Sequence, residues 1–168
     1  MRTPRRLATA VVLGLAITAT AAASTADKKL TAKGVGKIKL GALATDLRAD
    51  GLIGRLTGGC ELEGPNTRSA RLKAPLKGSV DFTRSDPRKV TSITIRGGAA
   101  ARGVAVGDTL ADITAAFPKR KIIRATEPIF GFTRVKIPKD GGGRMDFAVR
   151  VKTGKITSIQ VPRLKICD

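Results

Sequence analysis

The chain has 168 residues, and its 32 Lys and Arg against 13 Asp and Glu give a formal net charge of +19. It contains no His, which removes the commonest general base near neutral pH and the second member of ordinary Ser-His and Cys-His nucleophile pairs. With only two Cys and no His, a four-ligand zinc site is excluded as well.

The first 26 residues have the three-part layout of a secretory signal peptide. A cationic head with Arg2, Arg5 and Arg6 precedes an apolar run from Leu7 to about Ala23, and small residues follow it. Cleavage is favoured over a membrane anchor because Gly and Thr interrupt this short run. No later segment has the roughly 20 apolar residues that a bilayer crossing needs. We therefore expect a secreted or extracytoplasmic product.

Without its first 26 residues the chain keeps 29 Lys and Arg and all 13 acidic residues, a formal charge of about +16. Such a field attracts polyanions over a Debye length of roughly 10 Å. The expected partner of an exported chain is an anionic cell-envelope polymer or an acidic protein. Nucleic acid is disfavoured because Tyr and Trp, which stack on bases, are absent. The alternative is that the charge only confers solubility.

The rest of the chain contains an internal duplication. An upstream segment, Ile38–Gly41, recurs 66 positions later as Val104–Gly107, and three further segments recur in the same order. These are Arg71–Pro75 with Arg134–Pro138, Val80–Phe82 with Met145–Phe147, and Val90–Ile95 with Ile156–Val161. The predicted organisation is a flexible mature N-terminus (27–36), a first repeat (37–97), a Gly- and Ala-rich linker (98–103) and a second repeat (104–168).

The first repeat begins with a helix, predicted over 42–50 because Leu43 and Leu47 share one face and Gly51 follows. Alternation of apolar and polar residues, the period of a half-buried strand, then locates the strands. They are predicted over 70–76, 80–84 and 90–96.

The second repeat follows the same order. Its helix is predicted to begin at Asp108 or Thr109, either of which can cap it, with Asp112 in the first turn and Ile113 on the buried face. Strands are predicted over 121–123, 132–137, 145–152 and 156–161. Each repeat is therefore a short helical segment followed by an antiparallel sheet of about three strands. We expect an α+β fold in which the helices pack on one sheet face.

The helix entry of the second repeat carries a family resemblance. The run Val106-Gly107-Asp108-Thr109, with Ile113 after it and strands beyond, resembles the two-layer αβ modules of small outer-membrane-assembly lipoproteins. The tandem arrangement resembles secreted β-lactamase inhibitor proteins. The first copy has Leu43 where the Thr of this entry falls. The resemblance implies a shared architecture for binding.

The repeated chemical feature of the chain is cationic. A basic pair on the polar side of one strand recurs on the equivalent strand of the second repeat, and a third pair stands on the outer side of a further strand. Arg side chains bind carboxylate or phosphate through two parallel hydrogen bonds. The alternative is a solvated face that prevents edge aggregation. The anion-binding candidates are Arg71, Lys73, Arg134, Lys136, Arg150 and Lys152.

The two cysteines, Cys60 and Cys167, lie in different repeats. An exported chain with an even number of Cys more often pairs them than leaves them free, so a disulfide is expected. It would close a ring of about 100 residues, which is worth roughly 4 to 5 kcal/mol in the loop-entropy model. The competing roles, metal ligand and nucleophile, lack partner residues.

Two acidic pairs are repeat-equivalent, Asp46 with Asp112 and Asp81 with Asp146. An acid that occurs once per repeat indicates a cap, a turn or a salt bridge more than catalysis. The sequence therefore favours a secreted, non-enzymatic binding module with no catalytic residue, cofactor or metal. The alternatives are a protein-inhibitor or protein-partner module and a carboxylate-dependent hydrolase.

Overall fold

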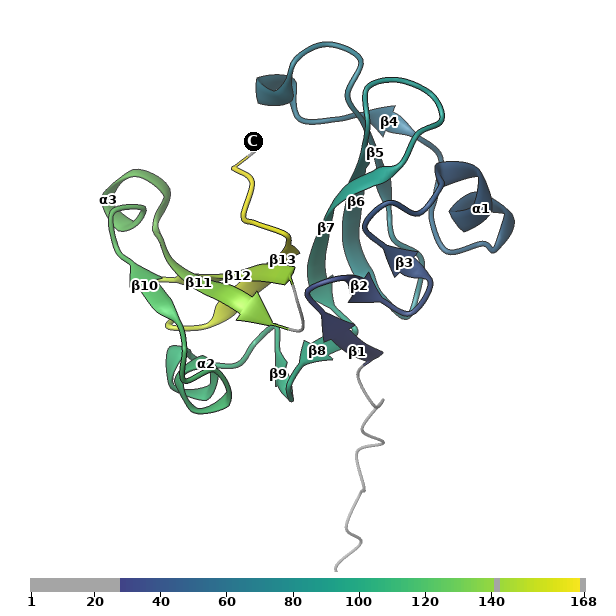
Figure 1. Ribbon diagram of the computed structural model, residues 1–168. Helices are drawn as coiled ribbons and strands as arrows, with labels where there is room; N and C mark the ends of the chain where they lie inside the picture. The colour runs from purple at the N-terminus through teal and green to yellow at the C-terminus, as the bar shows by residue number, and fades with distance from the viewer. Residues whose placement is uncertain (1–27, 141–142, 167–168) are drawn as a thin grey trace, which may run out of the picture.

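The structure is a computed structural model that describes residues 28–140 and 143–166 (Figure 1). It is mostly β, with 47% strand and 15% helix. The predicted α+β fold with helices packed on one sheet face is therefore wrong. The strands form one sheet of eight strands and one of five, and the order of the larger sheet is β10-β11-β12-β13-β7-β6-β5-β4. The expected signal peptide (1–26) and Cys167 lie outside the described residues.

The eight-stranded sheet is antiparallel throughout and takes four strands from each half of the chain. The first half supplies β4 (Thr57–Gly58), β5 (Arg68–Arg71), β6 (Lys77–Phe82) and β7 (Val90–Gly97). The second half supplies β10 (Lys121–Ile123), β11 (Phe132–Asp140), β12 (Gly143–Arg150) and β13 (Ile156–Val161). The halves meet where β13 pairs with β7, and Figure 1 shows the two parts of the sheet steeply inclined to each other.

The five-stranded sheet corrects two further expectations. It contains β1 (Lys28–Thr31), β2 (Gly34–Val35), β3 (Ile38–Lys39), β8 (Ala99–Ala101) and β9 (Val104–Ala105). Residues 27–36, predicted to be flexible, thus supply two strands, with Leu30 and Val35 buried. Residues 98–103, predicted as a linker, contain β8, which pairs with β1 in parallel. Ala99 and Ala101 are fully buried there, so their small size serves close packing.

The helices are too short to form a layer of their own, which is why the predicted two-layer architecture fails. They are α1 (Ala44–Ala49), α2 (Leu110–Ala116) and α3 (Glu127–Phe130), together with the 3-10 turn η1 (Glu61–Glu63). The start of α2 was predicted well: Thr109 caps it, and the Asp112 side chain completes a capping box with the Thr109 backbone N–H. Among the described residues, no helix is long and apolar enough to span a membrane.

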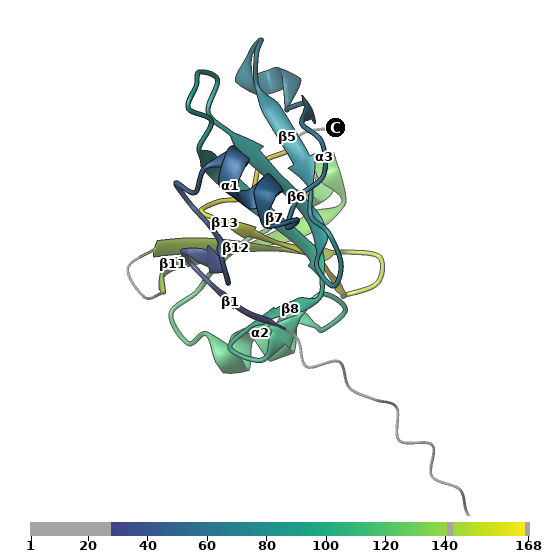
Figure 2. The same cartoon turned by 90° about the vertical axis from the view of Figure 1, so that its right-hand side faces the viewer.

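Alternation along the strands of the large sheet separates an apolar side from a polar side. Val80, Ile93, Ile159, Phe147 and Val135 are fully buried in one hydrophobic core, which the smaller sheet and α1 help to close. Figure 1 shows α1 and β3 on the same side of β6 and β7, and in Figure 2 α1 lies in front of that side. The polar residues between these positions form the opposite side of the sheet. In Figure 1 the segment after β13 (162–166), which we call the C-terminal segment, runs over that side, away from α1 and α2.

Equivalent backbone hydrogen bonds occur 66 positions apart. Gly41 N–H donates to the Val90 carbonyl oxygen (2.8 Å), and Gly107 N–H donates to that of Ile156 (2.9 Å). The bridge between Leu43 and Lys89 likewise has a counterpart between Thr109 and Lys155. The same local join between helix entry and strand is thus built twice. The boundaries of the two repeats stay predictions.

Candidate functional site

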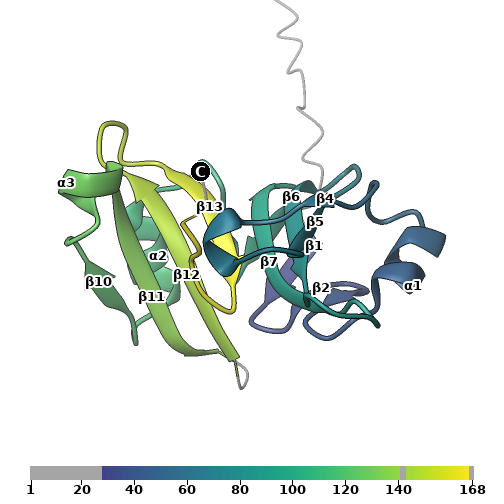
Figure 3. The same ribbon diagram turned by 90° about the horizontal axis from the view of Figure 1, so that it is seen from above.

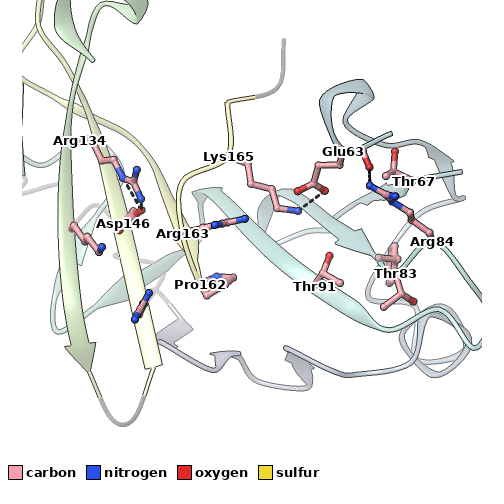
Figure 4. A pocket seen from close by; sticks show the side chains of 13 residues that line it. Glu63, Thr67, Thr83, Arg84, Thr91, Arg134, Asp146, Pro162, Arg163 and Lys165 are labelled. Atoms are coloured by element: carbon pink, nitrogen blue, oxygen red, sulfur yellow. Dashed lines mark hydrogen bonds and ion pairs between the residues drawn. The ribbon is translucent and has the colours of Figure 1, made fainter. Parts of the chain in front are cut away.

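A cleft of about 670 Å³ opens on the polar side of the large sheet (Figure 4). Figure 4 shows Arg134 and Asp146 on one wall, Glu63, Thr67 and Arg84 on the other, and Arg163 and Lys165 between them. Six cations and two carboxylates line the cleft, so it is strongly electropositive. We call it the basic cleft, and its cations are Arg84, Arg134, Lys136, Arg144, Arg163 and Lys165.

Strand β11 places Arg134 and Lys136 on the side of the sheet that the alternation predicted. Val135 and Ile137 are buried in the core, while Arg134 and Lys136 point to the other side and are half-buried. Lys136 lies opposite Asp146 of β12 in the strand register. Directly opposed residues of an antiparallel pair share a sheet face, so β11 and β12 together form one wall of the basic cleft.

Asp146 fixes the orientation of Arg134. Its side chain is 1% exposed, and one oxygen, Oδ2, accepts a hydrogen bond from Arg134 Nε at 2.9 Å and a second one from Nη2. The same oxygen accepts the backbone N–H of Leu164 at 2.8 Å. The other oxygen, Oδ1, is buried and has no hydrogen-bond partner. A buried ion pair of this kind holds its members in one geometry, so Arg134 is a fixed part of the wall.

The C-terminal segment after β13 crosses the polar face and brings two more cations to the cleft. Lys165 N–H donates to Gln160 Oε1 at 2.7 Å, and Leu164 is buried. Lys165 Nζ lies 2.7 Å from Glu63 Oε2 and 3.4 Å from Asp81 Oδ2. Lys165 therefore ties the segment after β13 both to η1 and to β6, and Arg163 is left exposed at the rim.

Asp81 is held in an unusual environment by this arrangement. Burial raises the pKa of its carboxyl above the ordinary value of 3.8, and the nearby Lys165 ammonium offsets part of that rise. Asp81 also lines a smaller cleft of about 230 Å³, which shares Lys165 with the basic cleft. The repeat-equivalent acids Asp81 and Asp146 thus both contact the C-terminal segment, through Lys165 and Leu164.

Three cations of the basic cleft have no side-chain partner among the described residues. The side chains of Lys136, Arg144 and Arg163 form no hydrogen bond or ion pair with the part of the chain that the structure describes. Arg84 donates to the backbone carbonyl oxygen of Glu63 and so meets a dipole instead of a full charge. Like charges gathered in one cleft repel each other, and a bound anion relieves that repulsion.

The other anion-binding candidates lie outside the basic cleft. Arg71 ends β5, opposite Ser79, and Lys73 follows it as an exposed residue. Arg150 ends β12, and Lys152 lies in the turn beyond it. Only Arg134 and Lys136 of the six predicted residues are brought together there.

Four cations of the cleft were missed. Arg144 lies two residues before Asp146 in β12, on the same side of the strand. The alternation could therefore have identified it as a residue of this face. Arg84, Arg163 and Lys165 lie outside regular strands, and no pattern marks them.

The described residues contain no cluster of three or more His, Cys, Asp and Glu suited to a metal ion. Cys60 directly precedes η1, and the contact between Lys165 and Glu63 brings the chain two residues before Cys167 to this neighbourhood. The expected disulfide stays a prediction.

Comparisons with models of protein families, with characterised proteins and with solved structures found no match.

Proposed function

We propose that the protein is an exported, non-enzymatic binding module that takes an anionic cell-envelope polymer in its basic cleft. The observation that carries this proposal is the set of three cations, Lys136, Arg144 and Arg163, that share the cleft and have no partner among the described residues. Carboxylate or phosphate groups, repeated along a polymer, match several separate cations at once. The leader-like first 26 residues support action outside the cytoplasm.

The rigid surroundings of these cations support the same conclusion. Arg134 is held by the buried Asp146, and the C-terminal segment is held by Lys165. A preorganised site loses little conformational freedom when it binds, which favours affinity. The chain has no Trp or Tyr, and Phe82, which lines the cleft, is buried, so the proposal rests on contacts to charged groups.

The test is binding of soluble polyphosphate and polyglutamate to the triple variant Lys136→Gln/Arg144→Gln/Arg163→Gln. We expect affinity to fall about a hundredfold, because charged hydrogen bonds are lost and each 1.4 kcal/mol is a factor of ten. The matched control removes the same charge from exposed positions elsewhere, in Lys33→Gln/Lys39→Gln/Lys119→Gln. Equal losses of affinity in the two variants would mean that only the net charge matters. That result would contradict a specific site in the cleft.

A salt titration separates this proposal from recognition of one acidic protein. Binding to a polyanion through exposed cations weakens steeply with ionic strength, since salt screens the charges. Saturable binding to a single protein that resists salt would favour the protein-partner alternative. Turnover of a polymer that one Asp or Glu substitution abolishes would instead establish a hydrolase.

A further inference from the structure

Three large apolar side chains stand exposed at one end of the large sheet, and none of them lines the basic cleft. Ile129 is 72% exposed, Phe130 45% and Val151 52%. Val151 N–H donates to the carbonyl oxygen of Gly131 at 3.0 Å, which ties the turn after β12 to the end of α3. Figure 3 shows α3 and this turn at the same end of β11 and β12. We call Ile129, Phe130 and Val151 the apolar tip.

Cations flank the apolar tip. Arg150 and Lys152 are the immediate neighbours of Val151, and both are exposed. Arg150 also lies opposite Phe132, whose ring stacks on that of Phe130 at 5.9 Å between centroids. These are the two predicted anion-binding residues that the basic cleft leaves unused at this end of the sheet.

The one acid of α3 adds little negative charge to this surface. Glu127 is paired with Arg124 at 3.0 Å, and its side chain is 23% exposed. The tip therefore combines exposed apolar groups with an excess of positive charge.

We propose that the apolar tip docks on an anionic lipid surface, with Ile129, Phe130 and Val151 entering the interface and Arg150 and Lys152 contacting acidic headgroups. Apolar residues backed by Lys and Arg are the combination that binds anionic bilayers at their surface. A protein partner fits less well, because a stable interface buries about 800 Å² per partner and the tip is built from one helical turn and one hairpin turn. This docking does not depend on the function proposed for the basic cleft.

The chain contains no Trp, so a single Trp introduced at the tip reports on its own surroundings. In Phe130→Trp we expect a blue-shifted emission with vesicles of mixed phosphatidylcholine and phosphatidylglycerol, and quenching by brominated acyl chains. Vesicles of phosphatidylcholine alone are expected to give no shift. The control is Leu62→Trp, at an apolar residue of η1 that is 81% exposed. The emission of this Trp is expected to stay unchanged, even where residues 1–26 themselves bind lipid.

Two variants in the Phe130→Trp background dissect the contact. Ile129→Ser/Val151→Ser is expected to weaken the partition onto anionic vesicles about tenfold. Arg150→Gln/Lys152→Gln is expected to weaken it more at low salt than at high salt, whereas Lys33→Gln/Lys39→Gln has no such effect. Circular dichroism and thermal unfolding verify that each variant is folded. An unshifted Phe130→Trp spectrum, an equal shift in Leu62→Trp, or equal binding to neutral vesicles would overturn the proposal.

Discussion

Thr94 and Gln160 lie opposite each other where β7 pairs with β13, and they are 66 positions apart. On either side of them the register pairs Ile95 with Ile159 and Ile93 with Val161. Because Ile93 corresponds to Ile159 and Ile95 to Val161 at the same spacing, exchanging the halves leaves this register unchanged. The two halves thus meet about a local pseudo-twofold axis through the Thr94–Gln160 pair, and this junction makes one continuous sheet.

The Arg134–Asp146 pair is expected to contribute strongly to stability. In Asp146→Asn the free energy of unfolding is expected to fall by about 3 kcal/mol, because a buried ion pair loses one charge and leaves the other uncompensated. Urea unfolding measures the change. In the control Asp50→Asn, whose partner Lys37 is 73% exposed, the expected loss is under about 1 kcal/mol. Equal losses in the two variants would contradict a special role of Asp146.

The raised pKa of Asp81 predicts a pH dependence of stability. The folded protein keeps the proton at pH values where the unfolded chain has lost it, so stability falls as the pH rises from 3.8 through the folded-state pKa. Asp81→Asn lacks this slope. Urea unfolding at several pH values between about 4 and 7 is expected to show wild type losing stability relative to the variant. A difference in unfolding free energy between wild type and Asp81→Asn that stays constant with pH, or that changes in the opposite direction, would contradict this prediction.

The predicted disulfide gives a third test. If Cys60 and Cys167 are bonded, the native protein contains no thiol that reacts with Ellman's reagent before reduction. Reduction, or the double variant Cys60→Ser/Cys167→Ser, is expected to lower the free energy of unfolding by roughly 4 kcal/mol, since the ring holds about 100 residues. Two reactive thiols in the folded, unreduced protein would contradict the bridge.

Gly78 allows no side chain. It lies in β6 with φ +136°, and a Cβ built there comes 1.9 Å from the carbonyl oxygen of Thr94. Gly78→Ala is therefore expected to lower the free energy of unfolding by more than about 2 kcal/mol, through backbone displacement between β6 and β7. Gly58→Ala is the matched control, because a Cβ at that strand glycine meets nothing within 4 Å, and its effect is expected to stay within about 0.5 kcal/mol.

Most strands of the large sheet could be predicted from the sequence because their signal is local. The exceptions are β4, which was not predicted, and β5, which ends at Arg71 although a strand was predicted over 70–76. The strands predicted over 156–161 and 121–123 have the observed bounds of β13 and β10. The alternation also oriented Arg134 and Lys136 away from the core. Buried and half-buried residues alternate along β11 from Phe132 to Ile137, so consecutive residues of that strand show the period of two.

The rest depends on partners distant in the chain. The Gly- and Ala-rich run around β8 is typical of a linker, yet it forms a strand between β9, which is close in the chain, and the distant β1, where Lys28 lies opposite Ala99. The contact between Lys165 and Glu63 spans 102 positions. No periodicity marks such pairings. The contribution of the C-terminal segment to the basic cleft, with Arg163, could therefore be found only in the structure.

The path of residues 162–166 over the polar face bears on how the protein is best produced. An affinity tag at the carboxyl end would be joined to the segment that carries Arg163, one of the cations that we assign to ligand binding. Strand β1, where the described chain starts, pairs with β8 and contributes no residue to the basic cleft. Material tagged at its carboxyl end is therefore expected to understate the affinity for polyanions, and a removable tag ahead of β1 keeps the binding surface clear.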